Sequence, residues 1–188
     1  MPNDPRHVDL RSVKSSVVSA SRLWEPKGLV AVLDTNVLVS ARLSRSTRRT
    51  VSKDIFSLAG LAYDSFTSPA ILEEVELVLA RPRFGIPKEE TRIWLDVFLR
   101  HSRQVDPGQI PGEYAETLGN DSKDNHVLKT AVAVNLHEEG RIAVEESVRR
   151  DGCYIVSADS DFEEGRVVWG WKFIRPEDFF RLLKSLAC

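Results

Sequence analysis

The chain has 188 residues, which suits one globular domain with a short appendage, and 42% of them are hydrophobic, enough for one sizeable core. The 26 basic and 28 acidic side chains nearly cancel, so the net charge by itself points to no partner. No apolar run approaches the roughly 18–20 residues of a membrane span, the N-terminus lacks an apolar signal region, and the two cysteines have no metal-ligand or disulfide spacing, so we expect a cytoplasmic protein without a membrane segment.

The hydrophobic pattern predicts alternating strands and helices after a polar N-terminal extension of residues 1–28. The predicted strands are Leu29–Leu33, Tyr63–Thr67, Gln104–Val105, Cys153–Ser157 and Val167–Ile174. The predicted helices span about 46–61, 69–79, 87–103, 120–136 and 138–150, and a last helix begins at Pro176. Because strand and helix alternate, we expect one α/β domain over residues 29–188, with three layers in which helices cover both faces of a mostly parallel sheet.

Acidic residues follow the predicted buried strands and begin the helices that come after them. Asp34 ends the first strand directly, and Asp159 follows Cys153–Ser157 after one residue. Glu74 lies in the first turns of the helix after the second strand, and Asp124 in the first turn of the helix that begins near residue 120. Because ligands of open parallel sheets bind beyond the carboxyl ends of the strands, we expect these four carboxylates on one rim.

Four carboxylates on one rim repel one another unless a cation neutralises them. Hard divalent ions that prefer oxygen ligands, Mg²⁺ or Mn²⁺, suit such a cluster, and they can activate water and stabilise the leaving oxygen of a phosphodiester. Each acid has a simpler explanation when it is taken alone. Asp34 is equally well a turn residue, Asp121 and Asp161 are good helix caps, and Glu73 and Glu74 lie where a helix N-terminus favours acids. Their joint placement is what favours a metal site.

Four segments, in order, resemble the motifs of the PIN-domain nucleases. VLDTNVLVSA (Val32–Ala41) resembles the opening strand and turn of that family. SPAILEEVELVLARPRF (Ser68–Phe84) is similar to the second motif of the subgroup described as toxin components of toxin–antitoxin systems. DSKDNHVLKTA (Asp121–Ala131) resembles the third motif and YIVSADSDF (Tyr154–Phe162) the fourth. The resemblance runs from about Leu29 to Leu183, so it covers most of the chain.

The resemblance implies a PIN-like fold and an Mg²⁺- or Mn²⁺-dependent endoribonuclease that hydrolyses RNA with metal-activated water and forms no covalent enzyme intermediate. It also implies that the protein is a toxin, that a cognate antitoxin binds it, and that two copies of the chain form a homodimer. Carried over one position at a time, the metal-binding and catalytic acids are Asp34, Glu74, Asp124 and Asp159, with Asp161 as a further metal ligand through water. Glu73 remains the alternative to Glu74. Asn36 would orient Asp34 by a hydrogen bond, and Asp121 would act as a cap or outer ligand.

The chain departs from the family pattern in two places. The N-terminal extension precedes a strand that usually begins the protein, and the stretch 135–151 is longer than the usual link between the third and fourth motifs. Neither departure touches the acids. Both leave the oligomer interface, the antitoxin and the choice of RNA target open.

A basic cluster follows the first motif and is a candidate nucleic-acid-binding surface. Arg42 and Arg45 lie closest in sequence to Asp34, so we expect them to contact phosphates beside the metal site. The later basic residues of the cluster are equally well a solvated helix face.

Three other side chains are expected to take no part in metal binding or catalysis. His126 comes two residues after Asp124, and helical geometry turns it about 200° away, so we expect a surface histidine. Trp169 and Trp171 alternate along one predicted strand, so they should share a face and serve packing more than base stacking.

Two other functions compete with the nuclease. A phosphatase or phosphoacceptor protein would also use a strand-end aspartate, but Asn36 stands where the phosphatases need a second aspartate, and neither class accounts for Glu74. A non-catalytic PIN-like module that binds RNA or protein is the stronger alternative. Retention of all four acids argues against it, because a module that does not cut has no need of a repulsive cluster. Cleavage of DNA in place of RNA also stays open.

Overall fold

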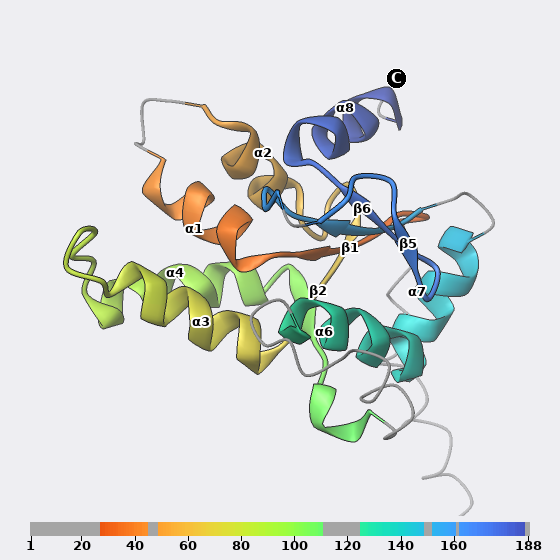
Figure 1. Ribbon diagram of the computed structural model, residues 1–188, viewed down its shortest axis with the longest axis horizontal. Coiled ribbons are helices and arrows are strands. Elements are labelled where there is room, and N and C mark those ends of the chain that lie inside the picture. Colours follow the sequence, from red (N-terminus) through yellow and green to blue (C-terminus); the bar gives the residue numbers. More distant parts are fainter. Residues whose placement is uncertain (1–26, 45–48, 111–124, 149–151, 161, 187–188) are drawn as a thin grey trace, which may run out of the picture.

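The computed structural model describes residues 27–44, 49–110, 125–148, 152–160 and 162–186, and these residues form a six-stranded sheet flanked by helices (Figure 1). The strands are β1 (Val30–Leu33), β2 (Asp64–Thr67), β3 (Ser102–Gln104), β4 (Cys153–Val156), β5 (Val167–Val168) and β6 (Trp171–Ile174). They lie in the order β3-β2-β1-β4-β6-β5, and every neighbouring pair is parallel except β5 and β6. The expected α/β class with a mostly parallel sheet is therefore confirmed.

Helices cover both faces of this sheet. They are α1 (Thr35–Leu43), α2 (Val51–Leu58), α3 (Pro69–Leu79), α4 (Lys88–Leu99), α6 (Asn125–Leu136), α7 (Glu138–Val148) and α8 (Pro176–Leu186), with a 3-10 turn at Pro107–Gln109. In the view of Figure 1, α2 and α8 lie above the sheet, and α3, α6 and α7 lie below it. Within the described ranges, none of these helices combines the length and the apolar character that crossing a membrane requires.

The strand order creates a switch point beside β1. From β1 the chain adds β2 and then β3 on one side, and it later returns to place β4 and β6 on the other side. Leu33 pairs with Val156, and the Asp34 amide donates to the Val156 carbonyl over 3.0 Å. The residues that follow β1 and β4 therefore emerge side by side, at the place where ligands of open α/β sheets bind.

The core explains why the central strands read as uninterrupted apolar runs. All four residues of β1 and all four of β4 are buried, because helices cover both faces. Large side chains fill the layers between the sheet and the helices, and two of them have polar groups that form hydrogen bonds within the protein. The Tyr63 hydroxyl donates to the Ile55 carbonyl over 3.0 Å, and the Trp171 indole N–H donates to Asn135 over 3.0 Å.

Helix α1 was not predicted, and the helix expected over 46–61 is shorter than expected. Five of the nine residues of α1 are buried, including three consecutive apolar residues, Val37, Leu38 and Val39. A helix buried around so much of its circumference shows little amphipathic periodicity, so a search for a 3.6-residue pattern overlooks it. Thr50 caps α2, which begins at Val51.

Two other predicted elements are wrong in detail. The helix expected over 87–103 ends at Leu99, and the edge strand β3 takes up Ser102–Gln104. The single strand expected over Val167–Ile174 is a hairpin, because Trp169 and Gly170 both have positive φ, at 49° and 85°, as tight hairpin turns require. Trp169 thus lies in the turn whereas Trp171 is buried in β6, so the two indoles do not share a strand face.

Candidate active site

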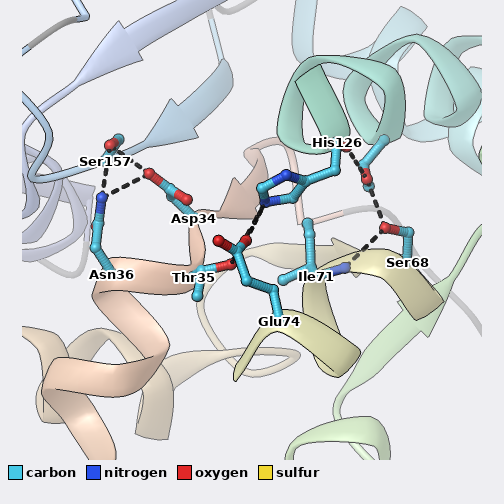
Figure 2. A network of polar contacts seen from close by, with 9 residues as sticks. Asp34, Thr35, Asn36, Ser68, Ile71, Glu74, His126 and Ser157 are labelled. Carbon is cyan, nitrogen blue, oxygen red and sulfur yellow. Dashed lines mark hydrogen bonds and ion pairs between the residues drawn. The ribbon is translucent and has the colours of Figure 1, made fainter. Parts of the chain in front are cut away.

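Asp34 lies at the switch point, where β1 ends and α1 begins, and its carboxylate is held by two neighbouring segments (Figure 2). The oxygen Oδ2 accepts hydrogen bonds from Asn36 Nδ2 and from Ser157 Oγ, both over 2.6 Å. Asn36 also accepts from the Ala158 amide over 3.1 Å. Asn36 therefore makes the expected hydrogen bond to Asp34, and it ties the start of α1 to the segment after β4.

Glu74 reaches this edge from the second turn of α3. Its oxygen Oε2 accepts a hydrogen bond from Thr35 Oγ1 over 2.7 Å, and Thr35 is the residue after Asp34. Glu73 is exposed on the same helix, whereas Glu74 is only partly exposed. The structure therefore brings Glu74 to the neighbourhood of Asp34, as Figure 2 shows.

His126 contacts Glu74, and the expectation of a surface histidine turned away from the site is wrong. The imidazole Nε2 lies 2.6 Å from Glu74 Oε2 and 3.4 Å from Thr35 Oγ1, and the side chain is only 20% exposed. The expected direction of His126 came from the helical angle between Asp124 and His126, on the assumption that Asp124 faces the site. The described part of α6 begins at Asn125, and tertiary contacts set its orientation toward α3.

A buried pair of hydroxyls joins α3 to α6. Ser68 caps the N-terminus of α3, where the Ile71 amide approaches its Oγ to 3.5 Å. Thr130 Oγ1 lies 2.7 Å from Ser68 Oγ and 2.7 Å from the His126 carbonyl oxygen, and both hydroxyl residues are fully buried. This Ser68–Thr130 clamp sets the helix that carries Glu74 against the helix that carries His126.

Asp159 lies on the segment after β4, which is also tied to the Asp34 carboxylate. The Asp159 amide donates to Ser157 Oγ over 3.0 Å, and the same hydroxyl donates to Asp34. The Asp159 carbonyl accepts from Arg175 Nη1 over 2.5 Å. Ser157 thus connects the Asp34 carboxylate to the backbone of Asp159.

Burial dominates the electrostatics of Asp34, which is 6% exposed. Desolvation raises the pKa of this carboxyl above its ordinary value, and the charge of Glu74 raises it further. The hydrogen bond from Ser157 and the nearby His126 imidazole oppose the rise in pKa. Burial and the charge of Glu74 therefore disfavour the ionised carboxylate, and a bound cation would stabilise it.

The described carboxylates fit a hard divalent cation by donor type. Both side-chain hydrogen bonds to Asp34 fall on Oδ2, so neither of them uses Oδ1. Asp34 and Glu74 supply oxygen atoms, which Mg²⁺ and Mn²⁺ prefer. Within the described residues no group of three or more acids, histidines or cysteines gathers into a metal site. Four residues expected at the site lie outside the described ranges, namely Asp121, Asp124, Asp161 and Arg45.

Arg42, expected to contact phosphates, forms an ion pair with Glu90 of α4, whose carboxylate lies 3.3 Å from Nη2. Sequence reasoning also overlooked Ser157 and Arg175. Ser157 could have been noticed, because it is the polar residue that ends a buried strand beside Asp159. Arg175 carried no local signal, since its place near Asp159 depends on the pairing of β4 with β6.

The chain is similar to a known protein family and to a solved structure. The family profile for the PIN domain matches residues 30–137. A crystal structure of VapBC2 from Rickettsia felis, bound to a DNA fragment from the promoter, is similar at a TM-score of 0.43 and 15% sequence identity. That match covers 78% of this chain and 98% of the other. No curated protein matches the chain.

Proposed function

The chain belongs to the PIN-domain family, and on that premise we propose that it is a divalent-metal-dependent endoribonuclease with Mg²⁺ or Mn²⁺ as its cofactor. The observation that supports this most directly is the placement of Asp34. Its carboxylate is buried at the switch point, accepts both of its side-chain hydrogen bonds on Oδ2, and lies beside the Thr35–Glu74 contact. A buried carboxylate next to a second acid is costly without a cation, so the arrangement favours metal binding over a structural role.

In this proposal, Asp34 and Glu74 are each held by two other side chains. Asn36 and Ser157 fix the orientation of Asp34, while Thr35 and His126 hold Glu74. Asp124 and Asp159 complete the proposed ligand set, with Asp161 contributing through water and Asp121 acting as a cap or outer ligand. When bound, the metal supplies an activated water nucleophile and a positive charge at the leaving oxygen.

We further propose that the nuclease is the toxin component of a toxin–antitoxin pair, acts in the cytoplasm and is confined to residues 29–188. The support is the likeness of Ser68–Phe84 to the second motif of the toxin subgroup. The partners in this proposal are an RNA substrate, a cognate antitoxin and a second copy of the chain. Induced expression should arrest growth, and the Asp34→Asn protein at equal abundance should not; equal arrest by both proteins would contradict a nuclease toxin.

The direct test of the nuclease is cleavage of single-stranded and structured RNA by the purified protein with Mg²⁺ or Mn²⁺. We expect fragments that EDTA abolishes and that disappear with Asp34→Asn and with Glu74→Gln. Glu73→Gln is the matched control, because it makes the same change one residue away on an exposed position, and it should cleave as the parent does. Cleavage that survives EDTA or Asp34→Asn would contradict the proposal. Single-stranded DNA in a parallel reaction tests the choice of RNA.

The alternative is a non-catalytic module that binds RNA or protein, and the Glu74–His126 contact is the observation that favours it. A protonated imidazole 2.6 Å from Glu74 could neutralise that carboxylate in place of a metal. Binding of RNA without cleavage, together with no thermal stabilisation by Mn²⁺, would select this alternative. A metal that binds the folded protein raises the melting temperature by mass action. If Mn²⁺ raises the melting temperature of the parent but not that of Asp34→Asn, the protein binds a metal at Asp34, which would contradict this alternative.

A further inference from the structure

Arg175 lies at the same sheet edge as the candidate site, although it is 16 residues beyond Asp159 in the chain. It follows β6 directly, and β6 pairs with β4 in parallel. The Ser157 amide donates to the carbonyl of Ile174, the residue before Arg175, over 3.2 Å. Arg175 is thereby set next to the segment that carries Ser157 and Asp159.

The guanidinium of Arg175 bonds to a neutral group. Its Nη1 donates to the Asp159 main-chain carbonyl over 2.5 Å, and this bond brings no negative charge to the guanidinium. Across the described ranges, no carboxylate lies within ion-pair distance of it. Arg42 and Arg181, in contrast, pair with Glu90 and Asp178. Arg175 is also partly buried, so its position is more restricted than that of a freely exposed side chain.

This charge lies where a nucleic-acid strand would need it. The carboxylates of Asp34 and Glu74 repel a phosphate backbone, and the Arg175 guanidinium beside the Asp159 carbonyl would offset that repulsion. A guanidinium has five N–H donors in a planar fork that suits two oxygens of one phosphate, and a single bond to a carbonyl leaves most of them available. Building on the proposed function, we propose that Arg175 binds a backbone phosphate of the RNA substrate on the β6 side of the candidate site.

The competing explanation is that Arg175 only anchors the segment after β4, and two substitutions separate the roles. Arg175→Gln keeps an N–H donor for the Asp159 carbonyl but removes the charge. Arg175→Lys keeps the charge but loses the planar fork. A phosphate-binding role predicts that Arg175→Gln weakens binding much more than Arg175→Lys does, whereas an anchoring role predicts that the two substitutions weaken binding equally.

The experiment measures binding of a fluorescein-labelled 2′-O-methyl oligoribonucleotide to the full chain in Ca²⁺, by anisotropy at several salt concentrations. For a single-stranded ligand, each phosphate neutralised contributes about 0.7 to the slope of log affinity against log salt. We expect Arg175→Gln to weaken binding about tenfold and to lower that slope by about 0.7. Arg175→Lys should keep the parent's slope. Arg181→Gln, on an exposed arginine of α8 that is already paired with Asp178, is the matched control and should bind as the parent does.

The proposal is overturned if Arg175→Gln binds with the parent's affinity and slope, or if the parent does not bind the oligonucleotide. It is also overturned if Gln and Lys weaken binding equally and both lower the melting temperature, because that pattern indicates an anchor alone. Cleavage of RNA by the parent protein distinguishes failure of the phosphate-contact proposal from failure of the nuclease proposal. A parent that cuts RNA while Arg175→Gln keeps the slope refutes only the phosphate contact, and a parent that binds but never cuts refutes only the nuclease.

Discussion

Asp34 is an acidic residue that is buried, although burial disfavours its ionised form. The folded protein leaves 6% of it exposed and places a second carboxylate, Glu74, near it. Two hydrogen bonds to Oδ2 offset part of the desolvation, yet burial still dominates and raises the pKa of the carboxyl. A carboxyl group whose pKa is raised by burial beside a second acid is typical of a functional site.

The residue-scale prediction is that Asp34→Asn stabilises the metal-free protein at neutral pH. The asparagine carbonyl oxygen can accept both hydrogen bonds, and the buried charge disappears. A gain of about 1 kcal/mol would raise the melting temperature by roughly 2–4 °C. Scanning calorimetry in EDTA measures it, and Asp96→Asn on the exposed face of α4 should leave the melting temperature unchanged. A lower melting temperature for Asp34→Asn would show that the carboxylate is structural.

The same prediction has a pH dependence whose sign follows from the raised pKa. The folded pKa of Asp34 lies above the ordinary value of 3.8, so folding is favoured by the protonated form and disfavoured by the ionised one. The ionised carboxylate therefore destabilises the fold above the folded pKa, and this effect fades as the pH falls toward 3.8. The gap between Asp34→Asn and the parent should be widest at neutral pH and should close in acid, and a gap that grows in acid would contradict the assignment.

Between elements, the Ser68–Thr130 clamp decides how α3 and α6 meet. Thr130→Val keeps the shape of the side chain but removes the hydroxyl, so buried polar atoms of Ser68 and His126 lose a partner. We expect the free energy of unfolding to fall by about 1–3 kcal/mol, measured by urea denaturation. Thr130→Ser retains the hydroxyl and should lose less. Equal losses for Val and Ser would mean that the methyl group, and not the clamp, stabilises the contact.

The junction of α6 and α7 depends on Gly140. Only His137 separates the two helices, and a Cβ built on Gly140 would lie 2.2 Å from the Val134 carbonyl oxygen. Gly140→Ala should therefore force the helices apart and cost about 1–3 kcal/mol of stability, again by urea denaturation. Glu145→Ala in the same helix is exposed and should change stability by less than about 0.5 kcal/mol. A neutral Gly140→Ala would mean that α7 can shift without loss.

Elements with a local pattern could be predicted, and elements set by tertiary contacts could not. The strand before Asp34, the Ser68-Pro69 helix start and the strand before Ser157 follow from apolar runs and capping residues, and the structure has them. Helix α1 could not, because its burial hides any periodicity. The direction of His126 depends on the Thr130 contact with α3, 62 residues away in the chain, which no sequence window contains.

At the scale of the whole molecule, the switch point was predictable and the pairing across it was not. Alternating strands and helices predict that acids at strand ends share one rim, and Asp34 and Asp159 do follow adjacent strands. The sequence does not reveal that β6 joins β4, and this pairing is what brings Arg175 to the rim. Local patterns thus predicted acids of the candidate site, whereas the position of Arg175 beside Asp159 depends on the strand order.

Cys153 offers a probe of how the whole sheet opens. It begins β4 in the middle of the sheet, is 3% exposed, and burial raises the pKa of its thiol from 9.0 to about 11. Only the thiolate reacts with alkylating reagents, so the folded chain should react at pH 8 far more slowly than the unfolded chain. With Cys188→Ser as the single-thiol protein, the labelling rate should follow global unfolding and rise to the rate of a free thiol in urea. The raised pKa also means that stability falls as the pH rises from 9 toward 11, because ionisation favours the unfolded chain. Rapid labelling of the native protein at pH 8 would show that β4 opens locally, and the edge that carries Ser157 and Asp159 would then be mobile in solution.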